Sequence, residues 1–547
     1  MRENEWSLDL LLRTSSEHRL VTPLRFAFIG YLFCLAAGPF HSTCLRGLNA
    51  QTATEDQRKK PAAGSRGLVI NEDNSHFCLY RPADKMTRAG LDEFIDQYAG
   101  KQVTHLFFCP NGMRINYRTK AKGWESIWDG NHPEKSENNH WLHNFWLLDQ
   151  RGLDPYAVWT VRCRKKGISP WITMRMNVFS WRDETDHFSH STFWKKHPEL
   201  WRLRPHRSEL DYGMPAVRQR SLALIREFFE RYDVDGLELD WMRWPTHFRP
   251  GDEQKGRKVL TEFIRQVRAL AGEWSEKRAH PIQISARVPA VPEAALGLGL
   301  DGVAWAKEGL IDILVPASFL DADFDIPVDR WRKLIGSKSQ VTLAPCLESG
   351  VRGHPELGPN AKSWVTNRVA MVRGFTAAML HRGADQIYLF NFMDDYLPPD
   401  EYRSILTQCG RLETVVDKPR RHIVTSHDVA APGAPHPSSL PKPLVAGKPV
   451  KFSLYTGPRL ATGRAVIRAI LANGQNVDQA QLAARLNSAV CRPIADLGKL
   501  DQFVESTRIT QFDVPLSSLR EGNNQIEMSL EAGGEQKLLW LEILMSP

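Results

Sequence analysis

From about residue 67 to residue 410 the sequence repeats one pattern, a short apolar run followed by a segment with helical period. This alternation is typical of parallel strands joined by crossover helices. The apolar runs are eight in number, which is the strand count that closes a (β/α)₈ barrel. They cover residues 77–80, 103–109, 171–177, 236–241, 282–288, 311–319, 341–347 and 387–392. We therefore predict an α/β fold with a (β/α)₈ TIM barrel over residues 67–415.

Helical segments separate these runs, and three of them are clear in the sequence. Residues 214–232 place Leu224, Ile225 and Phe228 on one stripe, which is the spacing of an amphipathic helix. Residues 259–274 repeat apolar side chains every three or four positions, and residues 362–381 form another long helical pattern. We expect these helices to cover the outside of the barrel.

The composition changes after residue 415. Residues 416–445 are rich in proline, alanine, glycine and serine, which is typical of a linker. Beyond them, strand-like runs alternate with turn pairs such as Asn473-Gly474, as in antiparallel strands joined by tight turns. The runs cover residues 450–455, 465–470, 509–514, 525–530 and 537–544. We predict a C-terminal antiparallel β-sandwich over residues 446–547 as an accessory domain.

Residues 1–66 have the pattern of a targeting segment followed by a linker. Arg19 and Arg25 precede an apolar run over residues 26–38, which is shorter than the roughly 20 residues that a membrane-spanning helix needs. We expect export to the periplasm or the exterior of a bacterial cell. The alternative is an uncleaved anchor, and only through this segment would the protein then contact a membrane.

The formal net charge is +8, and the basic residues are spread along the whole chain. No zinc-finger spacing, aromatic RNA-binding pattern or basic arm accompanies this charge, so we expect no nucleic-acid partner. An ordinary basic surface explains the charge, and attraction to an anionic polysaccharide is the alternative. No C-x-x-C pair occurs, and no His-x-His pair marks the first strand. We therefore expect neither a metal nor another cofactor.

Two long insertions, residues 112–155 and 178–213, follow the second and third predicted strands. Connections of this kind build the C-terminal face of a barrel, where barrel enzymes carry their active sites. Eleven of the 17 Trp residues fall between residues 112 and 250, including Trp241 and Trp244. Indole rings suit stacking against sugar rings, and the alternative is that they anchor large loops. We expect an aromatic-rich cleft.

The fourth predicted strand carries two acidic residues. Glu238 and Asp240 share one face because side chains alternate along a strand, and Asp240 lies nearer the barrel mouth. Buried acids need cations or hydrogen-bond donors, and Arg175, Arg243 and Arg287 lie on or beside this strand and its neighbours. We place both acids in the catalytic set, with Asp240 as the acting residue and Glu238 as its support. The alternative is an ion pair that only braces the barrel.

Hydrolysis of a glycosidic bond needs a second carboxyl group on the other side of the scissile bond. Glu348 is the best candidate, because it directly follows the run 341–347 and shares its parity with the small residues Ala344 and Cys346. Small residues of this kind fit a crowded barrel interior. The competing candidates follow the sixth and eighth strands, and they are Asp321, Asp323, Asp394 and Asp395.

The fourth strand also resembles a known group. Its residues Asp235, Gly236, Leu239, Asp240, Arg243 and Pro245 match the pattern Asp-Gly-Ile-His-Leu-Asp-Tyr-Ile-Arg-Tyr-Pro of the glycosyl-hydrolase-like family-ten proteins. These are exported bacterial proteins with a TIM barrel, and the resemblance extends to the strand-five run 285–289. It implies a catalytic position for Asp240. This chain departs from the pattern at Glu238, where the group has His, and at Trp241 and Trp244, where it has Tyr.

Further polar and aromatic residues near strand ends are candidates for binding a sugar. We expect contacts with substrate from Asn111, Arg175, Asn177, Trp241, Arg243, Trp244, Arg287, Ser318 and Asn391. The sequence thus predicts an exported glycoside hydrolase that acts on a polysaccharide or oligosaccharide through two carboxyl groups at the barrel mouth. The alternative is a catalytically inactive barrel that binds glycan.

Overall fold

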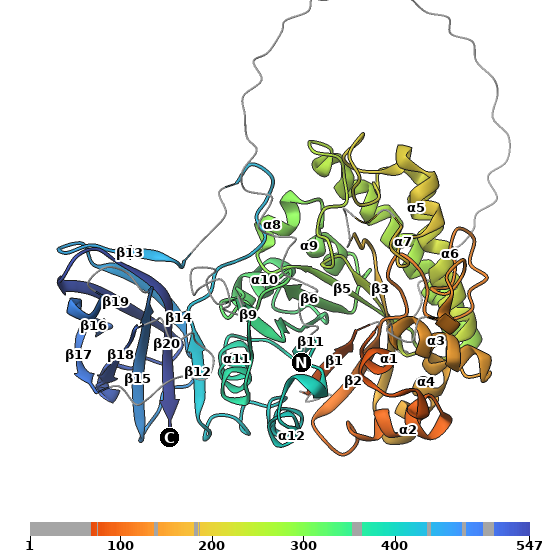
Figure 1. Ribbon diagram of the computed structural model, residues 1–547. Coiled ribbons are helices and arrows are strands. Elements are labelled where there is room, and N and C mark those ends of the chain that lie inside the picture. Colours follow the sequence, from red (N-terminus) through yellow and green to blue (C-terminus); the bar gives the residue numbers. More distant parts are fainter. Residues whose placement is uncertain are drawn as a thin grey trace, which may run out of the picture. The chain divides into compact units, whose positions relative to one another are not determined.

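The structure, a computed structural model, describes residues 67–547 apart from 74, 136–139, 180–183, 185, 353–363, 435–438, 473–476 and 496–507. Its first part is a closed barrel of parallel strands surrounded by helices (Figure 1). The barrel strands are β1 (Leu68–Glu72), β2 (Val103–Phe108), β3 (Ser169–Arg175), β4 (Gly236–Asp240), β5 (Gln283–Pro289), β6 (Ile313–Ala317), β7 (Thr342–Leu343) with β8 (Cys346–Glu348), and β11 (Ile387–Phe390). The predicted barrel is confirmed.

The seventh barrel strand is broken into β7 and β8 at Pro345. A proline has no N–H to donate to a strand ladder, so pairing stops there. The ladder continues on both sides, because β7 pairs with β6 and β8 pairs with β11. The run 341–347 therefore forms one barrel position, and Glu348 lies at its C-terminal end.

The prediction for the first strand was wrong. Residues 77–80 lie in the short helix α1 (His76–Tyr80), and the strand is the fully buried segment β1. An apolar run of four residues fits a helix face as well as a strand. The true strand was not recognised because it contains the polar residues Asn71 and Glu72. In the folded chain these bond Glu238 and Tyr98, which are distant in the sequence.

The barrel interior is filled by large side chains. Trp171 on β3 stacks on Phe107 of β2 with ring centroids 4.6 Å apart. Its ring lies against Gly236 of β4, where a Cβ atom would come within 2.5 Å of the indole. Glycine at this position is therefore required by the close approach of the ring, and the interior below the mouth is a packed core.

Helices join the strands and cover the barrel. They are α2 (Arg88–Asp96), α3 (His140–Gln150), α4 (Pro155–Lys166), α5 (Thr192–Lys196), α6 (Pro215–Arg231), α7 (Glu253–Arg278), α8 (Pro292–Gly297), α9 (Gly302–Lys307), α10 (Val328–Ile335), α11 (Val369–His381) and α12 (Pro399–Gln408). The predicted helices correspond to α6, α7 and α11. Helix α11 begins later than predicted, because β10 (Trp364–Thr366) pairs with β9 (Gly350–Arg352) before it.

The C-terminal part is an antiparallel sheet domain, and the predicted sandwich is confirmed. Its strands are β12 (Arg420–Ile423), β13 (Lys442–Leu444), β14 (Val450–Tyr455), β15 (Arg464–Leu471), β16 (Gln481–Leu486), β17 (Ala489–Ile494), β18 (Arg508–Val514), β19 (Asn523–Ala532) and β20 (Gln536–Ser546). Sequence patterns missed β16 and β17, which are joined by a tight turn with Asn487 and Ser488 at positive φ. They also missed β12 and β13, which lie in the proline-rich segment 416–445 and pair with β20.

Among the described residues, no helix is long and apolar enough to cross a membrane. The six cysteines of this part of the chain, Cys78, Cys109, Cys163, Cys346, Cys409 and Cys491, are buried as free thiols.

Candidate active site at the barrel mouth

Two acids and one arginine meet at the C-terminal ends of β4, β5 and β8. Arg287 donates from Nη1 to both carboxylate oxygens of Asp240, at 3.2 Å each, and from Nη2 to Glu348 Oε1 at 2.8 Å. Asp240 Oδ1 also accepts the backbone N–H of Met242 at 2.9 Å. The guanidinium of Arg287 lies over the ring of Phe390, 3.8 Å from its centroid. One cation therefore links the two acids that the sequence singled out.

All three side chains are buried. Asp240 and Arg287 are 0% exposed, and Glu348 is 2% exposed. Burial raises the pKa of the Glu348 carboxyl to about 8, because the loss of hydration outweighs the attraction of Arg287 and Arg243. Glu348 therefore keeps its proton at neutral pH, whereas Asp240 accepts two hydrogen bonds from a cation.

Glu238 lies deeper in the barrel than Asp240, on the same face of β4. Its carboxyl accepts hydrogen bonds from Tyr388 at 2.7 Å, Thr173 at 3.1 Å, Asn71 at 3.2 Å and Ser285 at 3.3 Å. Burial raises its pKa to about 7, and the negative charge of Asp240 adds to this effect. Four donors from four other strands satisfy this buried acid, an arrangement that fixes its position.

Arg175 pairs with a residue that the sequence analysis missed, Asp73. The Arg175 Nη2 atom donates to Asp73 Oδ2 at 2.6 Å. Burial alone would raise the pKa of Asp73, but Arg175 and Arg243 lower it to about 2. Asp73 directly follows β1, so correct placement of the first strand would have identified it as a residue of the mouth.

Arg243 differs from the other two arginines of the mouth, because its guanidinium makes no hydrogen bond or ion pair with any described residue. Burial lowers the pKa of Arg243, and the neighbouring cation of Arg175 lowers it further. The carboxyl groups of Asp73 and Asp240, and that of Glu348 once it has lost its proton, raise the pKa of Arg243 from a distance. A partly buried cation of this kind is suited to receiving an anionic group.

Other polar atoms near the strand ends also lack partners among the described residues. They are Ser318 Oγ after β6, Ser349 Oγ after β8, Asn391 Oδ1 after β11 and Arg287 Nε on β5. Asn391 has a positive φ of 57°, which is uncommon for a residue other than glycine. A buried polar group without a partner costs about 1–3 kcal/mol. A ligand rich in hydroxyl groups would offset this cost.

The side chains of Asn111 and Asn177 bond backbone groups of the barrel and its loops. The side chain of Asn111 bonds the backbone N–H and C=O of Arg175 at 3.1 and 3.0 Å, joining the ends of β2 and β3. The side chain of Asn177 bonds the backbone of Leu210 in the same way, at 3.2 and 3.0 Å. The structure therefore does not bring either amide to the Asp240–Arg287–Glu348 group.

The tryptophans of the second insertion and those after β4 differ in how far their rings are buried. Trp194 and Trp201 are buried and stack on each other at 4.9 Å. Trp241 is fully buried against Tyr212 and His247, whereas Trp244 is half-buried and contacts Phe319 after β6. Of the two tryptophans proposed for substrate binding, Trp244 is the one that lies partly open. Trp181 lies outside the described residues.

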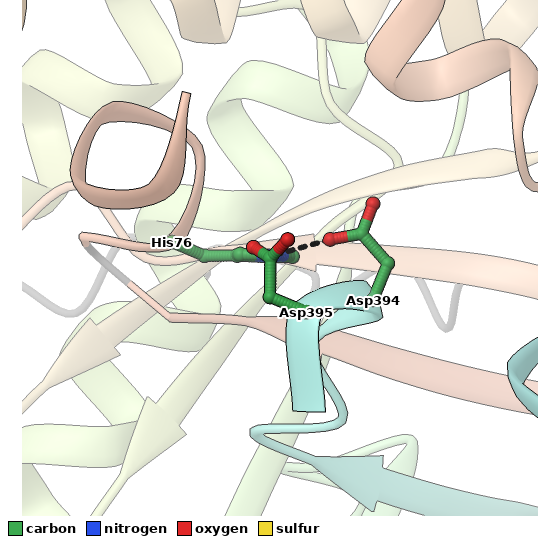
Figure 2. A group of neighbouring side chains, drawn as sticks. All are labelled: His76, Asp394 and Asp395. Carbon is green, nitrogen blue, oxygen red and sulfur yellow. Dashed lines mark hydrogen bonds and ion pairs between the residues drawn. The ribbon is translucent and has the colours of Figure 1, made fainter. Parts of the chain in front are cut away.

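Three of the four acids that competed with Glu348, namely Asp323, Asp394 and Asp395, belong to other networks. Asp394 and Asp395 lie beside His76, and these three residues could geometrically hold a cation (Figure 2). Glu72 and Asp394 flank the His76 ring, and Arg81 bonds both aspartates. Burial would lower the pKa of His76, but Glu72 and Asp394 raise it to about 9. The group therefore forms an ion-pair network in which Arg81 and protonated His76 already supply the positive charge.

Asp323 is also taken up elsewhere, because it accepts hydrogen bonds from His427 at 2.6 Å and from Thr425 at 3.1 Å. Both donors come from the proline-rich segment that follows β12. Of the acids considered from the sequence, Glu238, Asp240 and Glu348 are therefore the ones that the structure brings together.

No family model matches the chain, and no curated protein matches its sequence. Among solved structures, the endo-beta-1,4-mannanase from Thermotoga petrophila is similar, with 11% identity over 86% of this chain and 97% of that chain and a TM-score of 0.40. The catalytic domain of psychrophilic chitinase B from Arthrobacter TAD20 has 12% identity over 64% of this chain and 96% of that chain, with a TM-score of 0.38.

The cycloisomaltooligosaccharide glucanotransferase from Paenibacillus sp. has 11% identity and a TM-score of 0.31. The match covers 87% of this chain and 57% of that chain, so this chain spans little more than half the length of that protein. Likenesses at this level of identity and TM-score carry no argument about chemistry. The function has to be inferred from the residues at the barrel mouth.

Proposed function

We propose that this protein is a glycoside hydrolase, with Glu348 as the general acid and Asp240 as the partner carboxylate. The observation that carries the proposal is the Asp240–Arg287–Glu348 group, in which one arginine holds two acids from different strands at the C-terminal end of the barrel. Active sites of TIM-barrel enzymes are built at this end. Glycoside hydrolysis uses a pair of carboxyl groups in different protonation states.

Each acid has a role that follows from its surroundings. Glu348 is protonated at neutral pH, because burial raises its pKa to about 8, and it would protonate the oxygen of the leaving group. Asp240, held by Arg287 and the Met242 N–H, would either attack the anomeric carbon or activate a water. Proton donation by a positioned acid contributes about 10²–10⁴-fold in rate. Glu238 is a positioning residue, which fixes β4 beneath Asp240 through its four hydrogen bonds.

The substrate class follows from the groups without partners. We propose a polysaccharide or oligosaccharide whose hydroxyls bond Ser318 and Asn391 and whose ring contacts Trp244. The unpaired guanidinium of Arg243 favours a sugar that carries a carboxylate or sulfate, and the net charge of +8 would attract such a polymer. For the N-terminal segment we keep the proposal of export, based on Arg19, Arg25 and the apolar run 26–38.

A second candidate function is supported by the burial of the group itself. Asp240 and Arg287 are 0% exposed and already paired, as they would be in a barrel that binds glycan at its rim without cleaving it. In that case the charged group would only brace the strands.

Hydrolysis of a panel of neutral and acidic polysaccharides tests the proposal. We expect the parent to cleave at least one polymer, and Asp240→Asn and Glu348→Gln to lose that activity. Glu542→Gln is a control outside the barrel, because Glu542 is a buried acid of the sandwich that is paired with arginines, in its case Arg421 and Arg468. If both site variants cleave like the parent, these roles are wrong. If the parent binds glycans but cleaves none, the binding function replaces hydrolysis.

A further inference from the structure

The proline-rich segment after β12 is an excursion from one edge strand of the sandwich. β12 pairs with residues 542–545 of β20, and β13 pairs with residues 536–538 of the same strand in the same antiparallel direction. Only residues 539–541 of β20 separate the two pairings, a span of about 13 Å at the usual rise of a strand. Residues 424–441 connect β12 to β13, far more chain than this gap requires. The length of this segment is therefore not set by the distance between the two pairings.

The excursion is bonded to the connection that follows β6 at the barrel mouth. Asp428 Oδ2 accepts the backbone N–H groups of Phe319 at 2.7 Å and Leu320 at 3.1 Å. Nearer β12, Thr425 Oγ1 accepts the N–H of Phe324 at 2.9 Å, and His427 bonds Asp323 at 2.6 Å. These contacts fasten residues 425–428 of the excursion to the connection after β6.

Beyond these contacts, Val429 of the excursion is partly buried against side chains of the barrel. Val429 packs against the same apolar cluster as Phe390, whose ring lies under Arg287. The charge of Asp428 acts on Glu348 and contributes to the raised pKa of that carboxyl. The excursion therefore lies next to the group proposed for catalysis, and that group has almost no exposed surface.

We propose that residues 424–434 form a cap on the barrel mouth, held closed by Asp428 on the Phe319 and Leu320 amides, and that a glycan chain reaches the site only when this contact opens. The cap belongs to the sandwich by its strand pairing, so the accessory domain supplies a moving wall of the active site. The access role rests on the proposed hydrolase function, whereas the closed contact itself does not.

Hydrogen exchange of the amides of Phe319 and Leu320 tests the contact without any substrate. In Asp428→Ala these amides lose their acceptor, and we expect them to exchange about tenfold faster or more, as for the loss of a hydrogen bond to a charged group. Asp417→Asn is the control, because Asp417 is an exposed acid just before β12. Unchanged exchange in Asp428→Ala would overturn the cap.

The access role is tested by activity in two variants, Asp428→Ala and a truncation that replaces residues 424–441 with three residues opposite 539–541 of β20. On a polysaccharide that the parent cleaves, we expect kcat/KM to rise several-fold in either variant, with a smaller change on a nitrophenyl glycoside. If kcat/KM on the polymer is unchanged or falls in the folded variants, the access role is wrong while hydrolysis stands. If the truncated protein does not fold, the activity of Asp428→Ala alone tests the access role. If the parent cleaves no substrate, both hydrolysis and the access role are wrong, and hydrogen exchange still tests the Asp428 contact.

Discussion

Replacing Arg287 with methionine would remove the one cation that Asp240 and Glu348 share. Breaking a buried ion pair by removing one partner costs about 3–5 kcal/mol, because the other charge is left uncompensated. Glu348 is protonated at neutral pH and is little affected, since the pKa of its carboxyl is raised to about 8. The cost falls on Asp240, which would keep only the Met242 N–H as a donor. We therefore expect Arg287→Met to lower the free energy of unfolding by about 3–5 kcal/mol at pH 7.

Urea unfolding at pH 7, followed by tryptophan fluorescence, measures this loss. The double variant Arg287→Met with Asp240→Asn is the informative comparison, because an amide at position 240 leaves no charge to bury. We expect the double variant to regain at least half of the lost stability. A loss below about 1 kcal/mol in Arg287→Met, or no recovery in the double variant, would refute the view that this arginine neutralises Asp240 in the barrel interior.

Three further predictions follow from other buried groups. The pKa of His76 is about 9 in the folded chain against 6.5 ordinarily. Protonated His76 therefore contributes about 3 kcal/mol of stability below pH 6.5, and this contribution is lost as the pH rises through 9. In His76→Gln the free energy of unfolding should not fall over this range, and an identical pH profile for both proteins would contradict the prediction. The pKa of Glu238 is about 7 in the folded chain against 4.5 ordinarily. The folded state therefore favours the protonated form, and the free energy of unfolding falls by about 3 kcal/mol as the pH rises from 4.5 through 7. Glu238→Gln should lose less stability between pH 4.5 and pH 7.5, as measured by unfolding at both values. Gly236→Ala places a Cβ within 2.5 Å of the Trp171 ring and should lower the free energy of unfolding by about 1–3 kcal/mol. The control Gly272→Ala in α7 has nothing within 4 Å of the added Cβ and should be neutral or stabilising by up to about 1 kcal/mol. Equal melting temperatures for the two variants would show that the Trp171 ring can move aside.

The barrel could be predicted from the sequence because most of its strands are buried on both faces. β6, for example, is a continuous apolar run that stands out from its surroundings. β1 did not stand out in this way. Its Asn71 bonds Glu238 and Tyr388, and its Glu72 bonds His76 and Tyr98, all from other elements. Partners that lie far away in the sequence cannot be recognised from the residues next to β1. The first strand was therefore predicted in the wrong place, and Asp73 was missed with it.

Parity along the strands was sufficient to bring Asp240 and Glu348 to one end of the barrel. Sequence could not reveal that Arg287 bridges them, because that contact depends on the order and register of β4, β5 and β8 around the closed sheet. The contact between the excursion and the barrel mouth could not be predicted from the sequence for a similar reason. The proline-rich composition of residues 416–445 is a local property, whereas the pairing of β12 and β13 with β20 joins residues about a hundred positions apart.

Leaving-group dependence in Glu348→Gln tests the central claim most directly. A general acid is needed for a sugar leaving group but hardly for dinitrophenolate, which departs without a proton. On a polysaccharide that the parent cleaves, Glu348→Gln should therefore lose about 10²–10⁴-fold in rate, with a far smaller loss on the matching dinitrophenyl glycoside, whereas Asp240→Asn should lose both activities. Cleavage of the polysaccharide by Glu348→Gln at the parent rate would contradict the assignment of the acid, and with it the proposed chemistry of the barrel mouth.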